Sequence, residues 1–483
     1  MPVIEHIFVL MLENRSFDHL LGFSQITGTD AETGQPTQID GLAGTESNSY
    51  GGKTYTVSPS APFTMATDPG HEFSDVVTQL AGPNASFPPG GPYPPVDCSG
   101  FAADFAADGG SDPGQVFMCF DPATLPVLTT LCREFAVCDR WFSSMPGPTW
   151  PNRFFAAAAS AGGLDHSPSV EDISLWETIH GFSFQNGTIF DRLKQSEIPF
   201  RLYGDWITIT GALKGISPTY IHGFSGFATD VADPSYPAGY TFIEPDYGAF
   251  WSDYVGGTSQ HPLDDVRGGE RIIKATYEAL RSSPLWDRSM LIITWDEHGG
   301  FYDHVSPGPA PAPGDGVNPG YNTSGFGFDV YGVRVPAVVV SPRIPRNLVD
   351  HRSYDHTSIL ATVEQAFGVA PLTARDAAAR SLLDLASLDQ ARTDAPTTLP
   401  DPAGSAVPTH PARTALPQAT HPDANVGGSN LAGFVHVALR QDLAVTPAEE
   451  HEQRLAKART ISTQGEARDY LEEVRRRVRA AMG

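Results

Sequence analysis

Two uninterrupted apolar runs, each ending in acidic residues, dominate the hydrophobic pattern of this chain. The first run is Ile7–Leu12, and Glu13–Asn14 follow it at once. The second run is Met290–Trp295, and Asp296–Glu297 follow it. Continuous apolar runs of this length are typical of strands buried on both faces of a parallel sheet. Because ligands of such sheets gather at the carboxyl ends of the strands, the pattern predicts that both polar clusters lie at one sheet edge.

The rest of the pattern alternates helices with short strands. A helix is predicted to begin at Ser16, whose hydroxyl suits an N-cap. Apolar spacing and short apolar runs predict helices over 72–81, 124–135, 269–282 and 358–367, and strands over 136–138, 200–203 and 338–340. This alternation predicts an α/β fold with a largely parallel central sheet. The chain has 47 Gly and 42 Pro, which predict long loops.

Composition divides the chain into three parts. Residues 1–372 hold the predicted sheet and form one domain. Residues 394–428 are rich in Pro, Ala, Thr and Gly, which predicts an extended linker. Residues 429–483 form a predicted helical tail, with capping-box patterns at Thr446–Glu449 and Thr463–Glu466. We expect the tail to pack on the main domain or on another subunit, so that an oligomer could form through it, and to take no part in chemistry.

Charge and cysteine content narrow the choice of partners and compartment. The 31 basic and 56 acidic residues give a net charge of −25, which argues against nucleic acid or strongly anionic membranes as partners. No apolar run is long enough to span a bilayer. The amino terminus has no basic region before an apolar stretch, so we expect a cytoplasmic protein, or an exported one whose leader has been removed. Cys98 and Cys119 could form a bridge in an exported protein, and the cysteines do not have zinc-ligand spacing.

The two acidic clusters favour a divalent cation. Three carboxylates and an amide oxygen at one sheet edge repel one another, and burying such a charge costs several kcal/mol, roughly the scale for an uncompensated ion. One divalent metal ion removes that cost. Ca²⁺, Mg²⁺, Mn²⁺ and Zn²⁺ all tolerate carboxylate oxygens, so the identity of the metal stays open. The alternative is that these carboxylates cap the helices that follow the strands.

Thr149 is the candidate nucleophile. It follows Gly147 and Pro148 and precedes Pro151, an arrangement that suits a loop opening directly into a helix. A hydroxyl at a helix N-terminus faces free backbone N–H groups and the positive end of the helix dipole, which bind phosphate and stabilise an alkoxide. An ordinary N-cap threonine would show the same pattern, so its position alone leaves both interpretations open.

Fifteen histidines offer acid–base groups. Phosphoryl transfer needs donors around the equatorial oxygens and an acid for the leaving group, and histidine can supply both. His298 and His304 follow the second acidic cluster closely enough to lie near it. The Gly-rich stretches lack a P-loop or dinucleotide pattern, so a nucleotide cofactor is not indicated. The sequence has no G-x-S-x-G elbow, which weighs against an α/β-hydrolase.

Three motifs together resemble the phosphoesterase family, which contains bacterial phosphatidylcholine-type and plant non-specific phospholipases C and related bacterial acid phosphatases. The motifs are Leu12–His19, Pro148–Arg153 and Thr294–Val305, and they occur in the family's order over about residues 4–368. The resemblance implies a three-layer α/β/α sandwich like that of alkaline phosphatase, with residues 1–372 as the catalytic domain.

The resemblance also implies roles for single residues. Four side chains would be metal or active-site ligands: Glu13, Asn14, Asp296 and Glu297. Thr149 would be the nucleophile that takes the phosphoryl group. His71, His261 and His222 would contact phosphate, and His261 would protonate the departing alcohol. Trp150 departs from the pattern, because histidine stands at that position in many relatives.

We therefore expect a hydrolase that cleaves phosphate esters through a covalent phosphothreonine, most specifically a phospholipase C-type enzyme. The alternatives are an acid phosphatase acting on soluble phosphomonoesters and a catalytically silent binding protein with the same fold. A lipid substrate needs an apolar groove. Four aromatic residues of the middle segment 165–260 could line such a groove or could instead belong to the hydrophobic core: Phe224, Phe227, Phe250 and Trp251. Residues 307–327 form a long Pro/Gly-rich loop after the second cluster and are a candidate lid.

Overall fold

The computed structural model describes residues 4–169, 180–217, 220–252, 254–317, 320–404, 418–426 and 430–482. Its strands are β1 (His6–Leu12), β2 (Thr27–Asp30), β3 (Pro36–Gln38), β4 (Ser47–Tyr50), β5 (Lys53–Thr56), β6 (Ala136–Cys138), β7 (Phe200–Gly204), β8 (Ile221–Gly223), β9 (Tyr240–Ile243), β10 (Ser289–Trp295), β11 (Ala337–Val340) and β12 (Leu348–Asp350). Two parts of the expected linker, residues 405–417 and 427–428, lie outside the described residues.

The helices surround this sheet and continue to the C-terminus. They are α1 (Phe17–Leu21), α2 (Phe73–Ala81), α3 (Phe101–Ala107), α4 (Pro126–Glu134), α5 (Thr149–Ala158), α7 (Ile189–Gln195), α8 (Phe227–Val231), α9 (Arg267–Arg281), α10 (Thr357–Phe367), α11 (Ala374–Ala378), α12 (Leu431–Val445), α13 (His451–Arg459) and α14 (Gln464–Met482). Short 3-10 helices lie at Pro113–Phe117, Ile209–Ala212, Phe224–Gly226, Trp286–Arg288, Leu383–Leu385 and Ala448–Glu450. Within the described ranges, no helix is both long and apolar enough to cross a membrane.

The described strands form one ten-stranded, largely parallel sheet, in the order β3-β2-β12-β6-β11-β10-β1-β9-β7-β8, beside a separate β4–β5 hairpin. The two long apolar runs are β1 and β10, which pair in parallel at its centre with every side chain buried. The predicted strand at 338–340 is β11, but it runs antiparallel to both β10 and β6. A short apolar run reads the same in either direction, so its sequence could not reveal that reversal.

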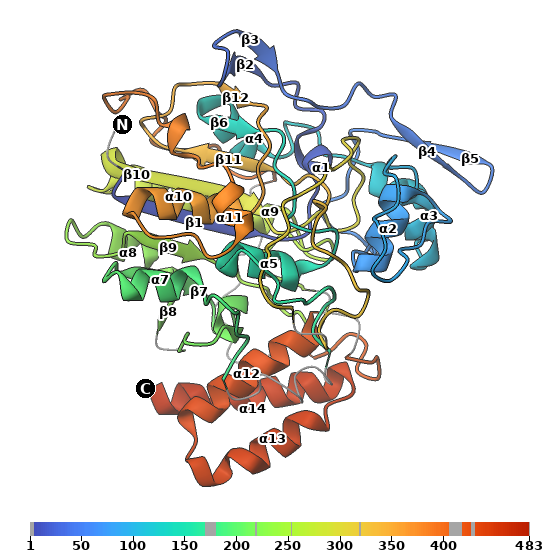
Figure 1. The fold of residues 1–483 in the computed structure, drawn as a ribbon, viewed down its shortest axis with the longest axis vertical. Helices are drawn as coiled ribbons and strands as arrows, with labels where there is room; N and C mark the ends of the chain where they lie inside the picture. Colours follow the sequence, from blue (N-terminus) through green and yellow to red (C-terminus); the bar gives the residue numbers. More distant parts are fainter. Residues whose placement is uncertain are drawn as a thin grey trace.

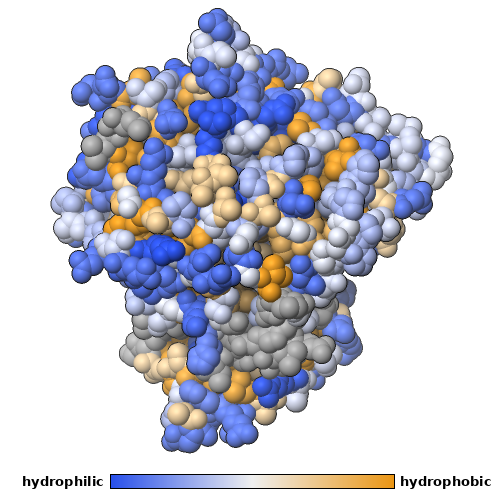
Figure 2. Space-filling model, viewed as in Figure 1, coloured by the Kyte–Doolittle hydropathy of each residue, from blue (hydrophilic) through white to orange (hydrophobic). Residues whose placement is uncertain are grey.

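Helices cover both faces of the sheet, which gives the expected three-layer α/β/α sandwich. Helix α5 contacts both α7 and α10 on the face turned toward the reader in Figure 1, and α4, α8 and α9 form the layer behind the sheet. The β4–β5 hairpin projects to one side, and the C-terminal helices lie below the sandwich (Figure 1). On the face drawn in Figure 2, hydrophilic residues predominate and apolar groups are scattered among them, which suits the large net charge.

The C-terminal helices pack against the main domain. Gly433 of α12 lies so close to Trp150 that a Cβ there would meet the indole at 2.2 Å. Phe434 packs 4.3 Å, between ring centroids, from Phe250. Arg440 donates hydrogen bonds to the carbonyl oxygens of Gly211 and Leu213 in the main domain. Trp150 therefore forms part of the surface on which the tail packs.

The structure tests the two capping boxes predicted in the C-terminal tail. Thr463 forms the predicted capping box with Glu466. The Thr463 hydroxyl accepts from the Glu466 N–H, and the Glu466 carboxylate accepts from the Thr463 N–H. The prediction at Thr446 is wrong: its hydroxyl donates to the Asp442 carbonyl, which closes α12 instead of starting a helix. All four cysteines lie in described ranges as buried free thiols, so the bridge considered for Cys98 and Cys119 is not formed.

Candidate active site

The carboxyl ends of β1 and β10 meet as the apolar pattern predicts. The register pairs Leu12 with Trp295, which brings the residues after both strands together. The backbone N–H of Asn14 donates to Asp296 Oδ1 at 3.1 Å, across 282 positions of sequence. The Asn14 side-chain amide donates to Glu297 Oε1. The structure therefore places all four expected ligands in one neighbourhood at this sheet edge.

Glu13 and Asn14 present buried oxygens that suit a cation. Among the described residues, neither carboxylate oxygen of Glu13 nor the side-chain oxygen of Asn14 has a hydrogen-bond partner, and both residues are fully buried. Burial and the neighbouring Asp296 charge raise the pKa of Glu13 well above its ordinary value, although the Arg153 charge and then the Ser259 hydroxyl oppose part of that rise. Asn14 is held at a φ of 61°, in the left-handed region. A divalent ion would compensate these oxygens, so the donor set fits a hard metal.

Asp296 and Glu297 are held apart by their own hydrogen bonds. Asp296 Oδ2 pairs with Arg153 Nε at 2.7 Å, and Glu297 Oε2 accepts from the Gly299 N–H at 2.7 Å. Burial raises the pKa of Asp296 to about 6, against the opposing charge of Arg153. In the described part of the chain, neither carboxylate belongs to a cluster of three His, Cys, Asp or Glu side chains with ligand atoms within 4.8 Å of one another.

Helix α5 brings Thr149 to the same edge. The helix begins at Thr149, as predicted, and Arg153 follows one turn later on the same face. Arg153 binds Asp296 and also donates to the Leu12 carbonyl at 2.9 Å, which ties α5 to the ends of β10 and β1. The Asn152 amide shapes the preceding loop through bonds to three of its carbonyls. The buried Thr149 hydroxyl accepts a hydrogen bond from Asn430 Nδ2 at 3.3 Å.

A cavity of about 370 Å³ opens beside Asn430, and His71 and His261 line it. Burial disfavours the charged ring of His71, but the Glu297 and Asp68 carboxylates raise its pKa to about 10. Burial lowers the pKa of His261 well below its ordinary value, and the charges of His71 and Arg15 lower it further. These surroundings favour the cationic form of His71 and the neutral form of His261.

The tautomer of His261 follows from its contacts. Its Nδ1 accepts from the Leu263 N–H at 3.3 Å, so the neutral ring carries its proton on Nε2. That nitrogen lies 3.4 Å from an Asp68 oxygen on the cavity wall. His261 therefore offers a hydrogen-bond donor to a ligand, and the cationic His71 is the better proton source.

His222 is not brought to this cavity. It lies on the edge strand β8, exposed, with its ring against Tyr203. Strand β8 is three strands from β1 in the sheet, which is roughly 14 Å at the usual strand spacing. We assign His222 no part in the chemistry described below.

Comparison with known proteins identifies the family. The sequence matches the Phosphoesterase family over residues 4–370. The chain belongs to the phosphoesterase family. It is 38% identical to non-specific phospholipase C6 of Arabidopsis thaliana, covering 82% of this chain and 75% of that protein. It is 28% identical to phospholipase C B of Mycobacterium tuberculosis, covering 76% and 74%. The solved phosphonate monoester hydrolase of Agrobacterium radiobacter aligns with 55% of this chain and 72% of its own, with a TM-score of 0.31 and 12% identity.

Two site residues of this phosphoesterase were missed by sequence reasoning. Arg153 ends the second motif, but its position five residues before the end of α5 gave no sign of its partner Asp296. Asn430 begins the tail, which was expected to have no part in the site. A single asparagine beyond a Pro-rich linker carries no periodicity or motif, so no signal in the sequence could have located it.

Replacing Asn430 by alanine should lower kcat about 10- to 100-fold, because the Thr149 hydroxyl loses the donor that orients it. The matched control is Gln441→Ala. Gln441 also ties the tail to the main domain, through the Trp206 carbonyl, but does not line the cavity. Steady-state kinetics on a soluble aryl phosphate would measure both variants. Equal losses in the two variants would mean that Asn430 acts only through the packing of the tail.

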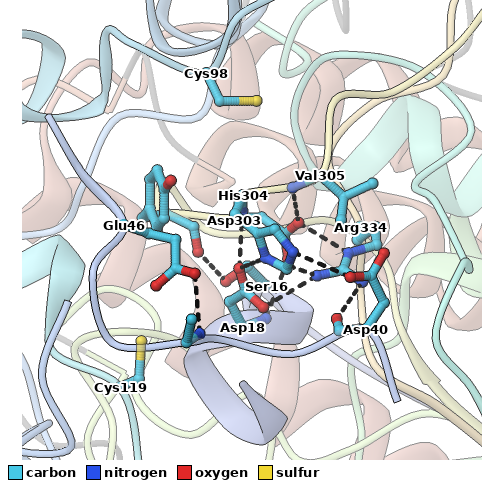
Figure 3. A network of polar contacts seen from close by, with 12 residues as sticks. Ser16, Asp18, Asp40, Glu46, Cys98, Cys119, Asp303, His304, Val305 and Arg334 are labelled. Atoms are coloured by element: carbon cyan, nitrogen blue, oxygen red, sulfur yellow. Dashed lines mark hydrogen bonds and ion pairs between the residues drawn. The ribbon is translucent and has the colours of Figure 1, made fainter. Parts of the chain in front are cut away.

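A second polar cluster in the phosphoesterase fold could hold a metal by composition. Ligand atoms of Asp18, Asp303 and His304 lie within 4.8 Å of one another. The Arg334 guanidinium already pairs with both carboxylates, at 3.0 Å from Asp18 and 2.8 Å from Asp303 (Figure 3). His304 Nδ1 also bonds Asp18, and its Nε2 faces Asp40. Arg334 compensates the negative charge of Asp18 and Asp303, so the network needs no metal ion. It joins the first and third motifs.

The charge of His304 makes the stability of this network depend on pH. Burial alone would lower the pKa of His304, but hydrogen bonds to Asp18 and Asp40 raise it to about 10. Because the folded-state pKa is raised, the stabilisation is full below about pH 6.5, the ordinary histidine value, and is lost as pH rises through about 10. The urea midpoint of the wild type should exceed that of His304→Asn most at pH 6.5 and least near pH 10. A gap that stays constant with pH would contradict this assignment.

Proposed function

We propose that this phosphoesterase cleaves the phosphodiester bond of a phospholipid in the manner of a phospholipase C, through a covalent intermediate on Thr149. One observation carries the proposal: Arg153 links the helix that begins at Thr149 to Asp296, beside the unpaired buried oxygens of Glu13. In this proposal the Thr149 hydroxyl would act beside the cation site. Asn430, which bonds that hydroxyl, lines a cavity together with His71 and His261.

Glu13, Asn14, Asp296 and Glu297 would hold one divalent metal ion. When bound, such an ion supplies Lewis-acid polarisation of a phosphoryl oxygen and lowers the pKa of a nearby hydroxyl. Glu13 would contribute a buried carboxylate whose oxygens have no hydrogen-bond partner among the described residues. The metal could be Ca²⁺, Mg²⁺, Mn²⁺ or Zn²⁺, since all four accept oxygen ligands.

The side chains then have distinct tasks in the reaction. The Thr149 hydroxyl gives its proton to water in the adjoining cavity, its Oγ attacks phosphorus, and the bond to the diacylglycerol oxygen breaks. Asn430 orients the attacking hydroxyl, and His71, which is cationic, donates a proton to the departing alcohol. His261, which is neutral with its proton on Nε2, donates a hydrogen bond to a phosphoryl oxygen. Water then releases the phosphorylated headgroup from Thr149. This assignment moves the acid role from His261, where sequence reasoning put it, to His71.

The walls of the cavity support a lipid substrate with a zwitterionic headgroup. Its lining includes the apolar side chains of Phe250, Trp251 and Leu263 and the carboxylates of Asp75 and Asp108. Aromatic faces and carboxylates both attract a quaternary ammonium group. Two other aromatics considered for the groove lie elsewhere: Phe227 is buried in α8, and Phe224 lines a separate hollow.

Parallel assays separate the candidate activities. The proposal predicts release of phosphocholine from phosphatidylcholine micelles at a kcat/KM well above that for a soluble aryl phosphate. The converse preference would favour the acid-phosphatase alternative. No turnover of either substrate, with divalent cations present, would favour the silent binding protein.

Metal removal gives a test that does not depend on activity. A divalent ion held by Glu13 should stabilise the fold by about 2.7 kcal/mol at a concentration 100 times its Kd. We expect a chelator to lower Tm in the wild type and added cation to restore it. Glu13→Gln should lose that response. Glu270→Gln is the matched control, because the Glu270 carboxylate is buried but bonded to the backbone N–H groups of Val127 and Leu128. A Tm response that persists in Glu13→Gln would place the cation elsewhere.

A further inference from the structure

Tyr254 lies inside the candidate site, although no sequence motif marks it. Its side chain is 6% exposed, whereas the next residue, Val255, is 52% exposed, so the chain turns the tyrosine inward and the valine outward. Tyr254 has a φ of +55°, in the left-handed region that bulky residues rarely adopt. Such conformations persist only where the surroundings over-determine them, and they concentrate at active sites and ligand clamps.

The loop that carries Tyr254 is fixed at its base. The Tyr254 N–H donates to the Ala249 carbonyl at 3.1 Å. The Gly256 N–H donates to Asp264 Oδ1 at 3.1 Å. Gly257 approaches Gly248 so closely that a Cβ on it would lie 2.9 Å from the Gly248 nitrogen. These contacts hold the tyrosine in place before any ligand binds.

The ring of Tyr254 stacks on His261. The two ring centroids are 3.4 Å apart and the planes differ by 3°. Together with the Leu263 N–H, which bonds His261 Nδ1, this stacking fixes the plane of the imidazole and the direction of its Nε2–H. Tyr254 therefore positions one of the two cavity histidines.

The phenol of Tyr254 is near the side chains of Glu13, Asp68 and Asn430. Burial and the charge of Glu13 raise its pKa well above the ordinary value, so the phenol keeps its proton. It interacts with the side-chain amide of Asn430, which itself donates to Thr149 Oγ. Tyr254 also lines the cavity. A neutral donor suits this position, because it can bind phosphoryl oxygens without adding charge.

We propose that Tyr254 is a further catalytic residue, whose phenol O–H donates a hydrogen bond to the phosphoryl group bound at Thr149 while its ring holds His261. The inference rests on the proposed function. The hydrogen bond would strengthen as negative charge develops on the equatorial oxygens of the transition state.

Tyr254→Phe removes the hydroxyl and keeps the stacked ring. We expect its kcat on a soluble aryl phosphate to fall about 10- to 100-fold, with KM changed less than about threefold and Tm unchanged. Inhibition by orthovanadate, a phosphoryl transition-state analogue, should weaken by about tenfold or more. Tyr254→Leu, which also removes the stacking on His261, should lose more in kcat. Tyr50→Phe, at an exposed position of the β4–β5 hairpin, is the matched control and should behave as wild type.

Wild-type kcat and wild-type orthovanadate inhibition in Tyr254→Phe would overturn the inference. A loss of kcat that only follows a lowered Tm would also overturn it. Thr149→Ala distinguishes a failure of the proposed function from a failure of the role given to Tyr254. If Thr149→Ala stays active, the proposed function itself is wrong; if Thr149→Ala is inactive and Tyr254→Phe is unaffected, only the role of Tyr254 fails.

Discussion

Thr149→Ala should abolish turnover, with kcat lowered about 10³-fold or more, while the protein remains folded. Thr149 Oγ is the hydroxyl at the start of α5, and Arg153 one turn later joins that helix to Asp296. Alanine keeps the helix start but has no oxygen to form the covalent bond to phosphorus. Phosphate-ester hydrolysis and circular dichroism, measured on the same preparation, would show the loss of activity and the retained fold.

Thr149→Ser is the matched control for that experiment. Serine keeps the hydroxyl that accepts from Asn430, so kcat should stay within about tenfold of wild type. Activity in the serine variant and none in the alanine variant would separate the chemistry of the oxygen from packing of the methyl group. Near-normal turnover in Thr149→Ala would refute the covalent scheme.

Arg334→Leu should destabilise the main domain by about 3–5 kcal/mol, the typical cost of removing one partner from a buried ion pair. Arg334 is fully buried between Asp18 and Asp303 and also donates to the carbonyl oxygens of Asp40 and Asp139. Leucine would leave two buried carboxylates facing each other with only His304 to compensate them. Urea unfolding followed by tryptophan fluorescence would measure the loss.

Arg140→Ala provides the comparison for Arg334. Arg140 pairs with Asp40 at 3.0 Å, but the two side chains are 41% and 34% exposed. Solvent screens such a pair, so its removal should cost less than about 1 kcal/mol. If both variants lost the same stability, the network around Arg334 would not be a buried electrostatic element.

The sequence allowed the centre of the fold to be predicted because burial on both faces leaves a direct signature. The runs Ile7–Leu12 and Met290–Trp295 became the central pair β1 and β10, and the residues after them converged. The helix-capping patterns were less reliable predictors, because they depend only on hydrogen bonds between neighbouring residues. Thr463 does cap α14, but the hydroxyl of Thr446, in a similar pattern, bonds back to the helix that precedes it.

Tertiary packing decided the parts of the site that the sequence could not reveal. Asn430 reaches Thr149 only because α12 packs on Trp150 across a glycine, a contact with no local sequence signature. Tyr254 enters the site through a left-handed backbone conformation in a glycine-rich loop. The difference in pKa between His71 and His261 likewise depends on which charged and polar groups surround each ring.

Trapping the covalent intermediate tests the central claim most directly. The protein would be mixed with excess phosphatidylcholine, quenched in acid within the first turnover, digested and mapped by mass spectrometry. We predict a phosphocholine adduct on the peptide that contains Thr149, and no such adduct in Thr149→Ala. An adduct on a different residue, or product formation in the first turnover with no adduct on any peptide, would contradict it.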